Sequence, residues 1–262
     1  MSDFLLSFIL GLIQGLTEFL PISSSAHLLL PSLLFGTNDL GLYFDISVHA
    51  GTLAAVIYYF KSDIFLMTQS VLTKNIDLQK YKNLSFQLLI ATIPVVLIGY
   101  IFKDLIEQRI FSIENIAISN LIFAAILLLA FLRNKSDKGI YEITLFTALF
   151  IGAFQCFALI PGASRSGTAI TAALLIGLNL KDASKFAFML GIPTILGALV
   201  LLVIDMQNTD IQFDFLILIT GFLTSMIFAF FTIKLFLSFV EKIGMVPFVL
   251  YRVLLGVILL LM

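Results

Sequence analysis

Residues 14–27 read QGLTEFLPISSSAH and gather a glutamate, a proline, three serines and a histidine between apolar runs. Proline lacks a backbone N–H and clashes with the preceding turn, so Pro21 predicts that a helix ends here. A break of this kind frees backbone polar groups, and lipid tolerates them only where protein or a wet cavity receives them. What surrounds the break therefore decides the fold.

The composition indicates that lipid surrounds it. The chain has 262 residues, of which 60% are hydrophobic and only 12% are charged, whereas soluble domains carry about 25% charged residues. A bilayer core needs roughly 20 apolar residues per helix. Six segments approach or exceed that length: 42–60, 84–102, 115–132, 185–204, 213–237 and 246–262. These features predict an all-α polytopic membrane protein with about six full transmembrane helices.

The sequence gives no support for nucleic-acid binding, a disulfide within the chain or a removable signal peptide. A net charge of −1 gives no reason to expect a nucleic-acid partner. The single cysteine, Cys156, rules out a disulfide within the chain. Met1-Ser2-Asp3 leads straight into apolar sequence, so we do not expect a removable signal peptide.

The basic residues predict an orientation. If 4–36 and 141–177 dip into the membrane and return, eleven Lys and Arg side chains fall on one side and two on the other. Lys103 and Arg109 form the smaller group. The larger group is Lys61, Lys74, Lys80, Lys82, Arg133, Lys135, Lys138, Lys181, Lys185, Lys234 and Lys242. The positive-inside rule then places the larger group in the cytoplasm and both termini outside. Full hairpins would give the same sides, so the charges do not decide whether these segments are re-entrant.

A second polar cluster, IPGASRSGT at 160–168, indicates an internal repeat. An offset of 140 residues aligns Pro21 with Pro161, Ser24 with Ser164, and Gly51 with Gly191. One deletion further upstream aligns Gly11 with Gly152 and Gln14 with Gln155. Three full spans lie between the two clusters, so the halves enter from opposite faces. We therefore predict one membrane domain, 1–262, with inverted repeats at about 4–132 and 141–262 and two broken or re-entrant helix pairs that meet at midplane.

The polar residues of the first cluster are candidates for chemistry. Gln14 and Glu18 share one helix face. A carboxylate at a helix end can snorkel to water, but ionisable residues within a membrane are rare and usually functional, so we interpret Glu18 as a metal ligand or general base. At least one of the three serines should cap the helix that follows. His27 is interpreted as a general acid or base, whereas His49 is explained equally well by packing.

Arg165 is the strongest signal in the second cluster. A buried guanidinium must face an acid or an anion; Glu18 would satisfy it, and so would an oxyanion substrate. Helix N-termini at the two breaks would add an anion site. This set suits a phosphate group, for which the sequence offers the serines and glycines Ser23, Ser25, Gly162, Ser164, Ser166 and Gly167, with Thr168. Arg252 we interpret as an interfacial or pairing residue.

These residues resemble those of a known family. QGLTEFLPISSSAH resembles the (E/Q)xxxE motif and the following Pro-x-Ser-Ser-(Ser/Thr)…His motif of the undecaprenyl-diphosphate phosphatase family, the bacterial enzymes linked to bacitracin resistance. PGASRSGTA resembles its PGxSRSxxT motif, and the resemblance extends over essentially the whole chain, including FDISVHAGTLAAV. Two positions depart from the pattern. Gln14 stands where many members carry Glu, and Ala169 replaces the last Thr, which leaves the role of Thr168 open.

The resemblance implies dephosphorylation of a C55 polyprenyl diphosphate to the monophosphate carrier lipid, assisted by Mg²⁺ or Ca²⁺. It also implies a multi-pass protein of the bacterial inner membrane whose site opens to the extracytoplasmic face. The expected partners are the lipid substrate and the bilayer; a homo-oligomer is compatible with the sequence, which defines no oligomeric state. We expect Arg165 and a divalent ion, held by Glu18 and by Gln14, to stabilise the transferring group.

Two questions stay open at the level of sequence. The nucleophile is Ser24, His27 or water, with Ser24 favoured because it lies beside the helix break. A secondary transporter or flippase for a phosphorylated polyprenyl lipid is the alternative function, since inverted repeats and broken helices are typical of transporters. The Ser24–His27 pair argues for the enzyme, because transport of an anion does not need it.

Overall fold

The structure is a computed structural model, which describes residues 2–73, 75–103, 112–206 and 214–261. Two residues used in the orientation argument, Lys74 and Arg109, lie outside these ranges. The α-helices are α1 (Asp3–Thr17), α2 (Ser24–Phe35), α3 (Gly41–Tyr59), α4 (Lys61–Leu72), α5 (Gln79–Ile101), α7 (Ile113–Arg133), α8 (Leu145–Gln155), α9 (Arg165–Leu175), α10 (Leu180–Met206), α11 (Phe215–Ile243) and α12 (Val246–Leu261). Three short 3₁₀ helices join them: η1 (Ile76–Leu78), η2 (Ile140–Glu142) and η3 (Cys156–Leu159).

The all-α polytopic fold is confirmed, although the spans differ in detail from the six predicted. In the ranges described, four helices, α5, α7, α10 and α11, are long and apolar enough to cross a membrane. The predicted span 42–60 is α3, which qualifies together with α4 as one span bent by 74°. The last predicted span is α12, whose 16 residues give a length of about 24 Å. That is shorter than a bilayer core of about 30 Å.

The two predicted breaks are present and share one backbone feature. The chain leaves α1 after Thr17 and begins α2 at Ser24; it leaves α8 and η3 after Leu159 and begins α9 at Arg165. Ser23 and Ser164, each directly before the new helix, have φ values of 71° and 73°. They are the only non-glycine residues with positive φ in the described part of the chain. The same rare turn at both breaks supports the inverted repeat, whose limits at 4–132 and 141–262 stay a prediction.

This equivalence corrects the repeat register by one residue at the breaks. Ser23, not Ser24, corresponds to Ser164 in backbone conformation, which is an offset of 141. The same offset relates Gly11 to Gly152 and Gln14 to Gln155. The alignment of Pro21 with Pro161 gave an offset one residue too small for the serines. The reason is that a proline marks where one helix ends and does not mark where the next helix begins.

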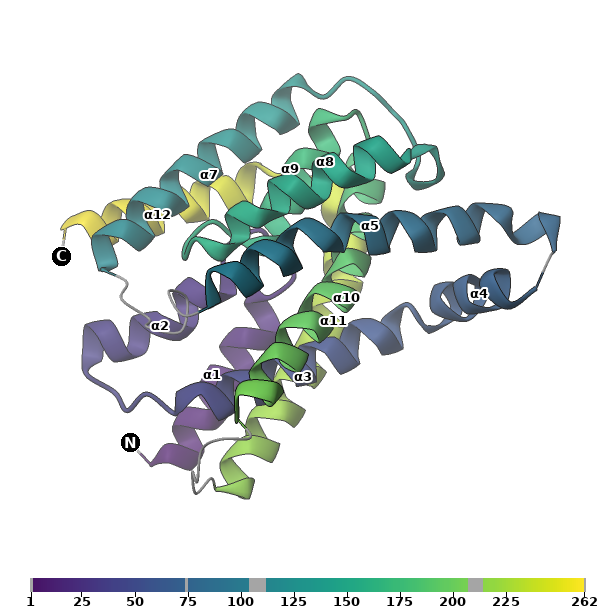
Figure 1. Cartoon of the computed structure of the whole chain (residues 1–262). Helices are drawn as coiled ribbons and strands as arrows, with labels where there is room; N and C mark the ends of the chain where they lie inside the picture. The colour runs from purple at the N-terminus through teal and green to yellow at the C-terminus, as the bar shows by residue number, and fades with distance from the viewer. Residues whose placement is uncertain (1, 74, 104–111, 207–213, 262) are drawn as a thin grey trace.

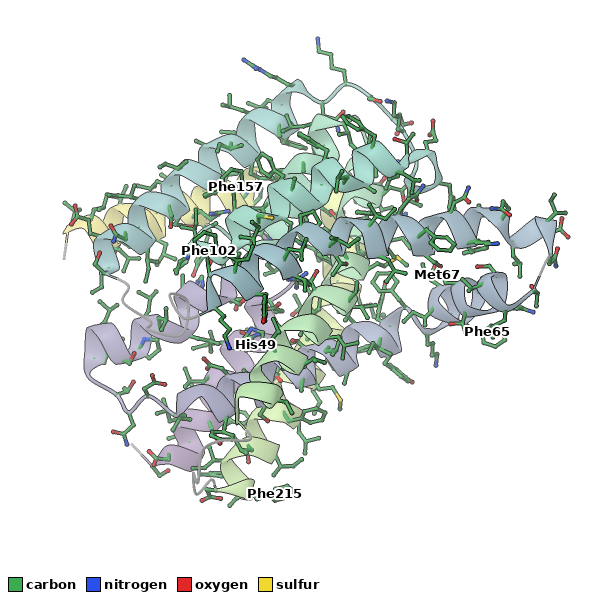
Figure 2. The ribbon with its side chains drawn as sticks, viewed as in Figure 1. His49, Phe65, Met67, Phe102, Phe157 and Phe215 are labelled. Atoms are coloured by element: carbon green, nitrogen blue, oxygen red, sulfur yellow. The ribbon has the colours of Figure 1, made fainter. Side chains whose placement is uncertain are left out.

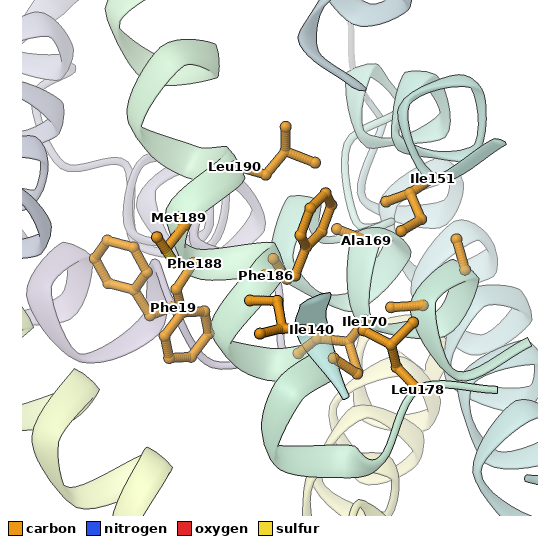
Figure 3. Packing of buried hydrophobic residues seen from close by; sticks show 14 of the residues in the cluster. Phe19, Ile140, Ile151, Ala169, Ile170, Leu178, Phe186, Phe188, Met189 and Leu190 are labelled. Carbon is orange, nitrogen blue, oxygen red and sulfur yellow. The ribbon is translucent and has the colours of Figure 1, made fainter. Parts of the chain in front are cut away.

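Helix α9 packs against α7, α8 and α10 (Figure 1). Its residues from Ser166 to Leu174 are all buried, and most of them are small. Ala169 and Ile170 pack in the main core cluster with Ile151 of α8 and Phe186 of α10 (Figure 3). Short side chains let these backbones approach closely, which is how helices associate in lipid.

Close approach also fixes α1 against α11. Gly11 and Gly15, four residues apart, face Gly221, Ser225 and Ala229 of α11. A Cβ on Gly11 would lie 2.9 Å from the Gly221 carbonyl oxygen. This small-residue seam places the end of α1, and therefore Glu18, against the long helix α11.

The outer surface is apolar, as expected in lipid. Phe65, Phe102, Phe157 and Phe215 are all exposed and project from different helices, whereas His49 lies near the middle of the molecule (Figure 2). The two ends of the chain lie at the same end of the structure, opposite the turn between α4 and α5 (Figure 1).

Gly15→Ala tests the seam between α1 and α11. The added carbon would lie 2.7 Å from the Ser225 carbonyl oxygen, and overpacking of this kind costs about 1–3 kcal/mol of unfolding free energy. Gly99→Ala is the matched control, because its new carbon meets only Leu159 Cδ2 at 3.8 Å. The chain has no tryptophan, so heat tolerance is best followed by size-exclusion chromatography in detergent. Equal tolerance of the two variants would contradict the close packing.

Candidate active site

The first break positions a buried carboxylate. Glu18 follows the last residue of α1, and its backbone N–H still donates to the Gln14 carbonyl at 2.9 Å. The next residue, Phe19, is fully buried and meets Phe188 of α10 edge-on, with 5.2 Å between ring centroids. This aromatic anchor holds Glu18, which is 6% exposed, at the junction of the two repeats.

Both oxygens of Glu18 are occupied by donors from different segments. Oε1 accepts from Arg165 Nη2 at 2.8 Å, so the ion pair between the two breaks is present. Oε2 accepts from Ser24 Oγ at 2.6 Å and from Gln14 Nε2 at 2.9 Å. One carboxylate therefore joins the guanidinium of the second break to the hydroxyl of the first.

The serines of the first break do not cap α2 with their side chains, contrary to the sequence interpretation. Ser23 is the N-cap residue but makes no side-chain cap bond, and its hydroxyl lies 3.3 Å from that of Ser25. The Ser24 hydroxyl donates to Glu18. Capping by the side chain fails here because the hydroxyls have other partners: Ser23 and Ser25 pair with each other, and Ser24 binds the carboxylate.

The second break is capped and tied to the first. Ser164 Oγ accepts from the Gly167 N–H at 3.1 Å and lies 3.3 Å from Ser166 Oγ. Ser166 Oγ also donates to the Leu20 carbonyl at 2.8 Å. Thr168 turns its hydroxyl to the Arg165 carbonyl of its own helix at 2.9 Å. Thus the hydroxyls of Ser166 and Thr168 donate to backbone carbonyls, whereas the hydroxyl of Ser164 caps the start of α9.

Three glycines leave room for the two arginines and the second break. A Cβ on Gly191 would collide with the Arg165 guanidinium, and one on Gly167 would lie 3.2 Å from Arg252 Nη1. Gly162 has φ +92°, and a Cβ there would collide with Ser119 and the Ile116 carbonyl of α7. Gly162 therefore serves the turn and the close packing against α7.

A cavity of about 740 Å³ opens over this cluster. Its polar lining residues are Glu18, Ser23, Ser24, Ser25, Ser32, Thr37, Asn38, Asp39, Asp45, His49, Ser164, Arg165 and Thr194. The remaining lining is apolar apart from Gly41, and comes chiefly from α2 and α10 with parts of α1, α3 and η3. Helices α2 and α9 both begin at this cavity, and the positive ends of their helix dipoles favour an anion there. A ligand with an anionic head and an apolar tail suits these walls.

His27 lies beside the cluster and is not among the residues that line the cavity. Its Nδ1 lies 2.7 Å from the Ser23 carbonyl oxygen, and its Nε2 lies 2.5 Å from the hydroxyl oxygen of Tyr251 on α12. A carbonyl only accepts, so Nδ1 carries the proton and Nε2 accepts from Tyr251. The structure does not place His27 against Glu18 or Arg165.

His49 is the side chain that sequence reasoning undervalued. It lines the cavity, and its Nε2 lies 3.9 Å from Glu18 Oε2, while Nδ1 is held by the Asp45 carbonyl oxygen at 2.7 Å. One signal was available in the sequence: His49 lies within an apolar span, where ionisable side chains are rare and usually functional.

The donors for a divalent ion are few. In the ranges that the structure describes, no three His, Cys, Asp or Glu side chains form a metal cluster. Gln14, however, has a buried amide oxygen, Oε1, without a hydrogen-bond partner. The amide nitrogen of the same side chain donates to Glu18. Mg²⁺ often takes one or two protein carboxylates and completes its shell with substrate phosphates and water. Glu18 with Gln14 fits that pattern.

These features define a class: a polytopic membrane protein whose two broken helices meet at a buried ion pair beneath a cavity with polar and apolar walls. The family described as "Bacitracin resistance protein BacA" matches residues 7–258. The chain belongs to this family.

Two curated relatives cover nearly the whole chain. "Undecaprenyl-diphosphatase" of Alcanivorax borkumensis is 43% identical over 260 residues, which are 98% of each chain. "Undecaprenyl-diphosphatase" of Saccharophagus degradans is 44% identical over 258 residues, which are 97% of this chain and 96% of the relative.

Proposed function

We propose that this protein hydrolyses undecaprenyl diphosphate to undecaprenyl phosphate and inorganic phosphate, and so recycles the carrier lipid used in cell-wall synthesis. The names of the two relatives and the membership of the family support this activity. The observation that carries it is the three-residue contact in which Glu18 binds Arg165 and Ser24 at once. Anion transport needs no hydroxyl activated by a carboxylate, so the transporter or flippase alternative is not favoured.

In the proposed mechanism Ser24 is the nucleophile. Its hydroxyl already donates to Glu18 Oε2 at 2.6 Å, so Glu18 accepts the proton as Ser24 Oγ bonds to the terminal phosphorus. The bond from that phosphorus to the bridging oxygen breaks, and undecaprenyl phosphate leaves. Water then attacks the phosphoserine, inorganic phosphate leaves, and Glu18 returns its proton to Ser24.

Arg165 neutralises the transferring phosphoryl group. Nη2 is held by Glu18 at 2.8 Å, and the guanidinium lines the cavity, so its other N–H groups can bind phosphoryl oxygens in a fixed fork. Ser23, Ser25 and Ser164 add hydroxyls around the same space. The N-termini of α2 and α9 supply further donors.

We assign the remaining predicted residues as follows. Gly162, Ser166, Gly167 and Thr168 support the phosphate site through the backbone contacts described above, and His27 fixes the start of α2 through the Ser23 carbonyl. Glu18 and Gln14 would hold Mg²⁺ or Ca²⁺. When bound, such an ion would offset phosphate charge in addition to Arg165.

We place the protein in the bacterial inner membrane with both termini outside and the cavity open to the extracytoplasmic side. The positive-inside count supports this orientation. The cavity is lined by the loop 37–41, and Asn38 of this loop bonds to Asp3 near the N-terminus. The rim of the cavity is therefore on the same side as the N-terminus.

Phosphate release from a short-chain isoprenyl diphosphate by the purified protein in detergent tests the function directly. Arg165→Lys should lower kcat by about 10²-fold or more, because an ammonium cannot hold two oxygens in a fixed fork. Arg133→Lys is the matched control, since Arg133 is exposed at the end of α7. Near-normal turnover by folded Arg165→Lys protein would mean that Arg165 serves only as the structural partner of Glu18.

The nucleophile can be identified by rapid acid quench and mass spectrometry of the peptide that contains Ser24 and His27. We expect an acid-stable phosphoryl group on Ser24 that is absent in Ser24→Ala protein. An acid-labile, alkali-stable adduct would instead indicate phosphohistidine at His27. Absence of any adduct, with solvent oxygen entering phosphate in one step, would indicate direct attack by water.

The orientation is tested by thiol labelling in a Cys156→Ser background. A cysteine in place of Asn208, which lies outside the described residues, should react with a membrane-impermeant reagent in intact cells. A cysteine in place of Asn75, which is exposed after α4, should react only after lysis. The reverse pattern would overturn both the topology and the extracytoplasmic opening.

A further inference from the structure

Arg252 of α12 is a fully buried charged residue outside the cavity. It is 0% exposed, and no carboxylate forms an ion pair with it in the part of the chain that the structure describes. A buried guanidinium without an acid is costly, so it must be satisfied by other acceptors. Its acceptors show what it is for.

Those acceptors come from both helix breaks. Nη1 donates to the Pro21 carbonyl at 3.3 Å. Nη2 donates to the carbonyls of Gly162 at 2.8 Å and Ala163 at 3.2 Å. One planar group therefore holds the first break three residues before Ser24 and the second break two residues before Arg165.

Asn120 of α7 fixes the guanidinium in that position. Its Oδ1 accepts from Arg252 Nε at 2.8 Å, and its Nδ2 donates to the Arg252 carbonyl at 2.7 Å. Asn120 is itself 1% exposed. The pair therefore forms a closed unit between α7 and α12 from which the guanidinium reaches the two breaks.

We propose that Arg252 is a positioning residue for catalysis: by binding the backbone of both breaks, it sets the place of Ser24 relative to Arg165. The proposal rests on the proposed phosphatase function. The ion pair of Glu18 with Arg165 joins the same breaks at the cavity, and Arg252 joins them behind it. Two attachments fix orientation as well as distance, which one ion pair does not.

The chemistry of the acceptors explains the choice of arginine. The three carbonyls belong to two segments, so they need several donors that point in different directions from one group. A guanidinium has five N–H groups that point outward within one rigid plane. Lysine carries one compact ammonium that cannot reach both breaks in the same geometry. The adjacent residue, Tyr251, contacts His27 at the start of α2, so α12 also touches the helix that carries Ser24.

The test compares Arg252→Lys and Asn120→Ala with Arg133→Lys, an exposed control on α7. For each purified protein, kcat and KM for phosphate release from farnesyl diphosphate are measured together with heat tolerance in detergent. A misplacement of about 1 Å near reacting groups costs about 10²-fold. We expect kcat to fall about 10- to 100-fold in both test variants, with KM changed less than about threefold because the cavity walls are intact.

The outcomes separate the proposal from its basis. A role in stability alone would lower heat tolerance and leave kcat per folded molecule unchanged, and this result in both test variants would overturn the proposal. If Arg252→Lys does not fold, Asn120→Ala decides alone, because it keeps the charge and removes only the group that orients it. A wild-type protein that releases no phosphate would contradict the proposed function, whereas active wild type with unchanged kcat in the test variants contradicts only the positioning role.

Discussion

The ion pair between Glu18 and Arg165 is the contact on which the rest of the structure depends. Each charge is placed at a helix break, and each would be costly in an apolar interior without the other. The pair spans 147 positions of sequence, so neither repeat can bury its charged residue until the other has folded against it. Broken helices become acceptable in lipid because two breaks satisfy one another.

The two breaks are alike in the positive φ of Ser23 and Ser164 and differ in their chemistry. With the offset of 141 given by Ser23 and Ser164, Glu18 corresponds to Leu159, and Ser24 corresponds to Arg165. Gln14 and Gln155 remain alike, and each has a buried amide oxygen without a hydrogen-bond partner. The first repeat thus supplies the carboxylate and hydroxyl, and the second supplies the guanidinium. One composite site results instead of two equivalent ones.

Much of this arrangement was predictable from residue types alone. Pro21 and Pro161 indicate the breaks, and the scarcity of charge in the membrane requires an acid opposite Arg165. The directions of the two histidines were not predictable, because they depend on how each helix is rotated about its axis. The left-handed turn at Ser23 directs His27 towards Tyr251, and only tertiary packing of α3 brings His49 to the cavity. The bend of 74° between α3 and α4 also lacks a proline or glycine signal at Phe60.

The two buried arginines show how one residue type is divided between binding and architecture. Arg165 has a side chain that is 13% exposed, contacts one carboxylate and a distant carbonyl at 3.5 Å, and keeps donors directed at the cavity. Arg252 is 0% exposed, and its three side-chain nitrogens donate to one amide oxygen and three backbone carbonyls. A guanidinium at a cavity that has N–H groups without an acceptor in the protein can bind an anion. A guanidinium whose nitrogens all donate to the protein can only hold those acceptors in place. Burial and donor use, not charge, therefore distinguish the arginine that lines the cavity from the arginine that is bound to backbone.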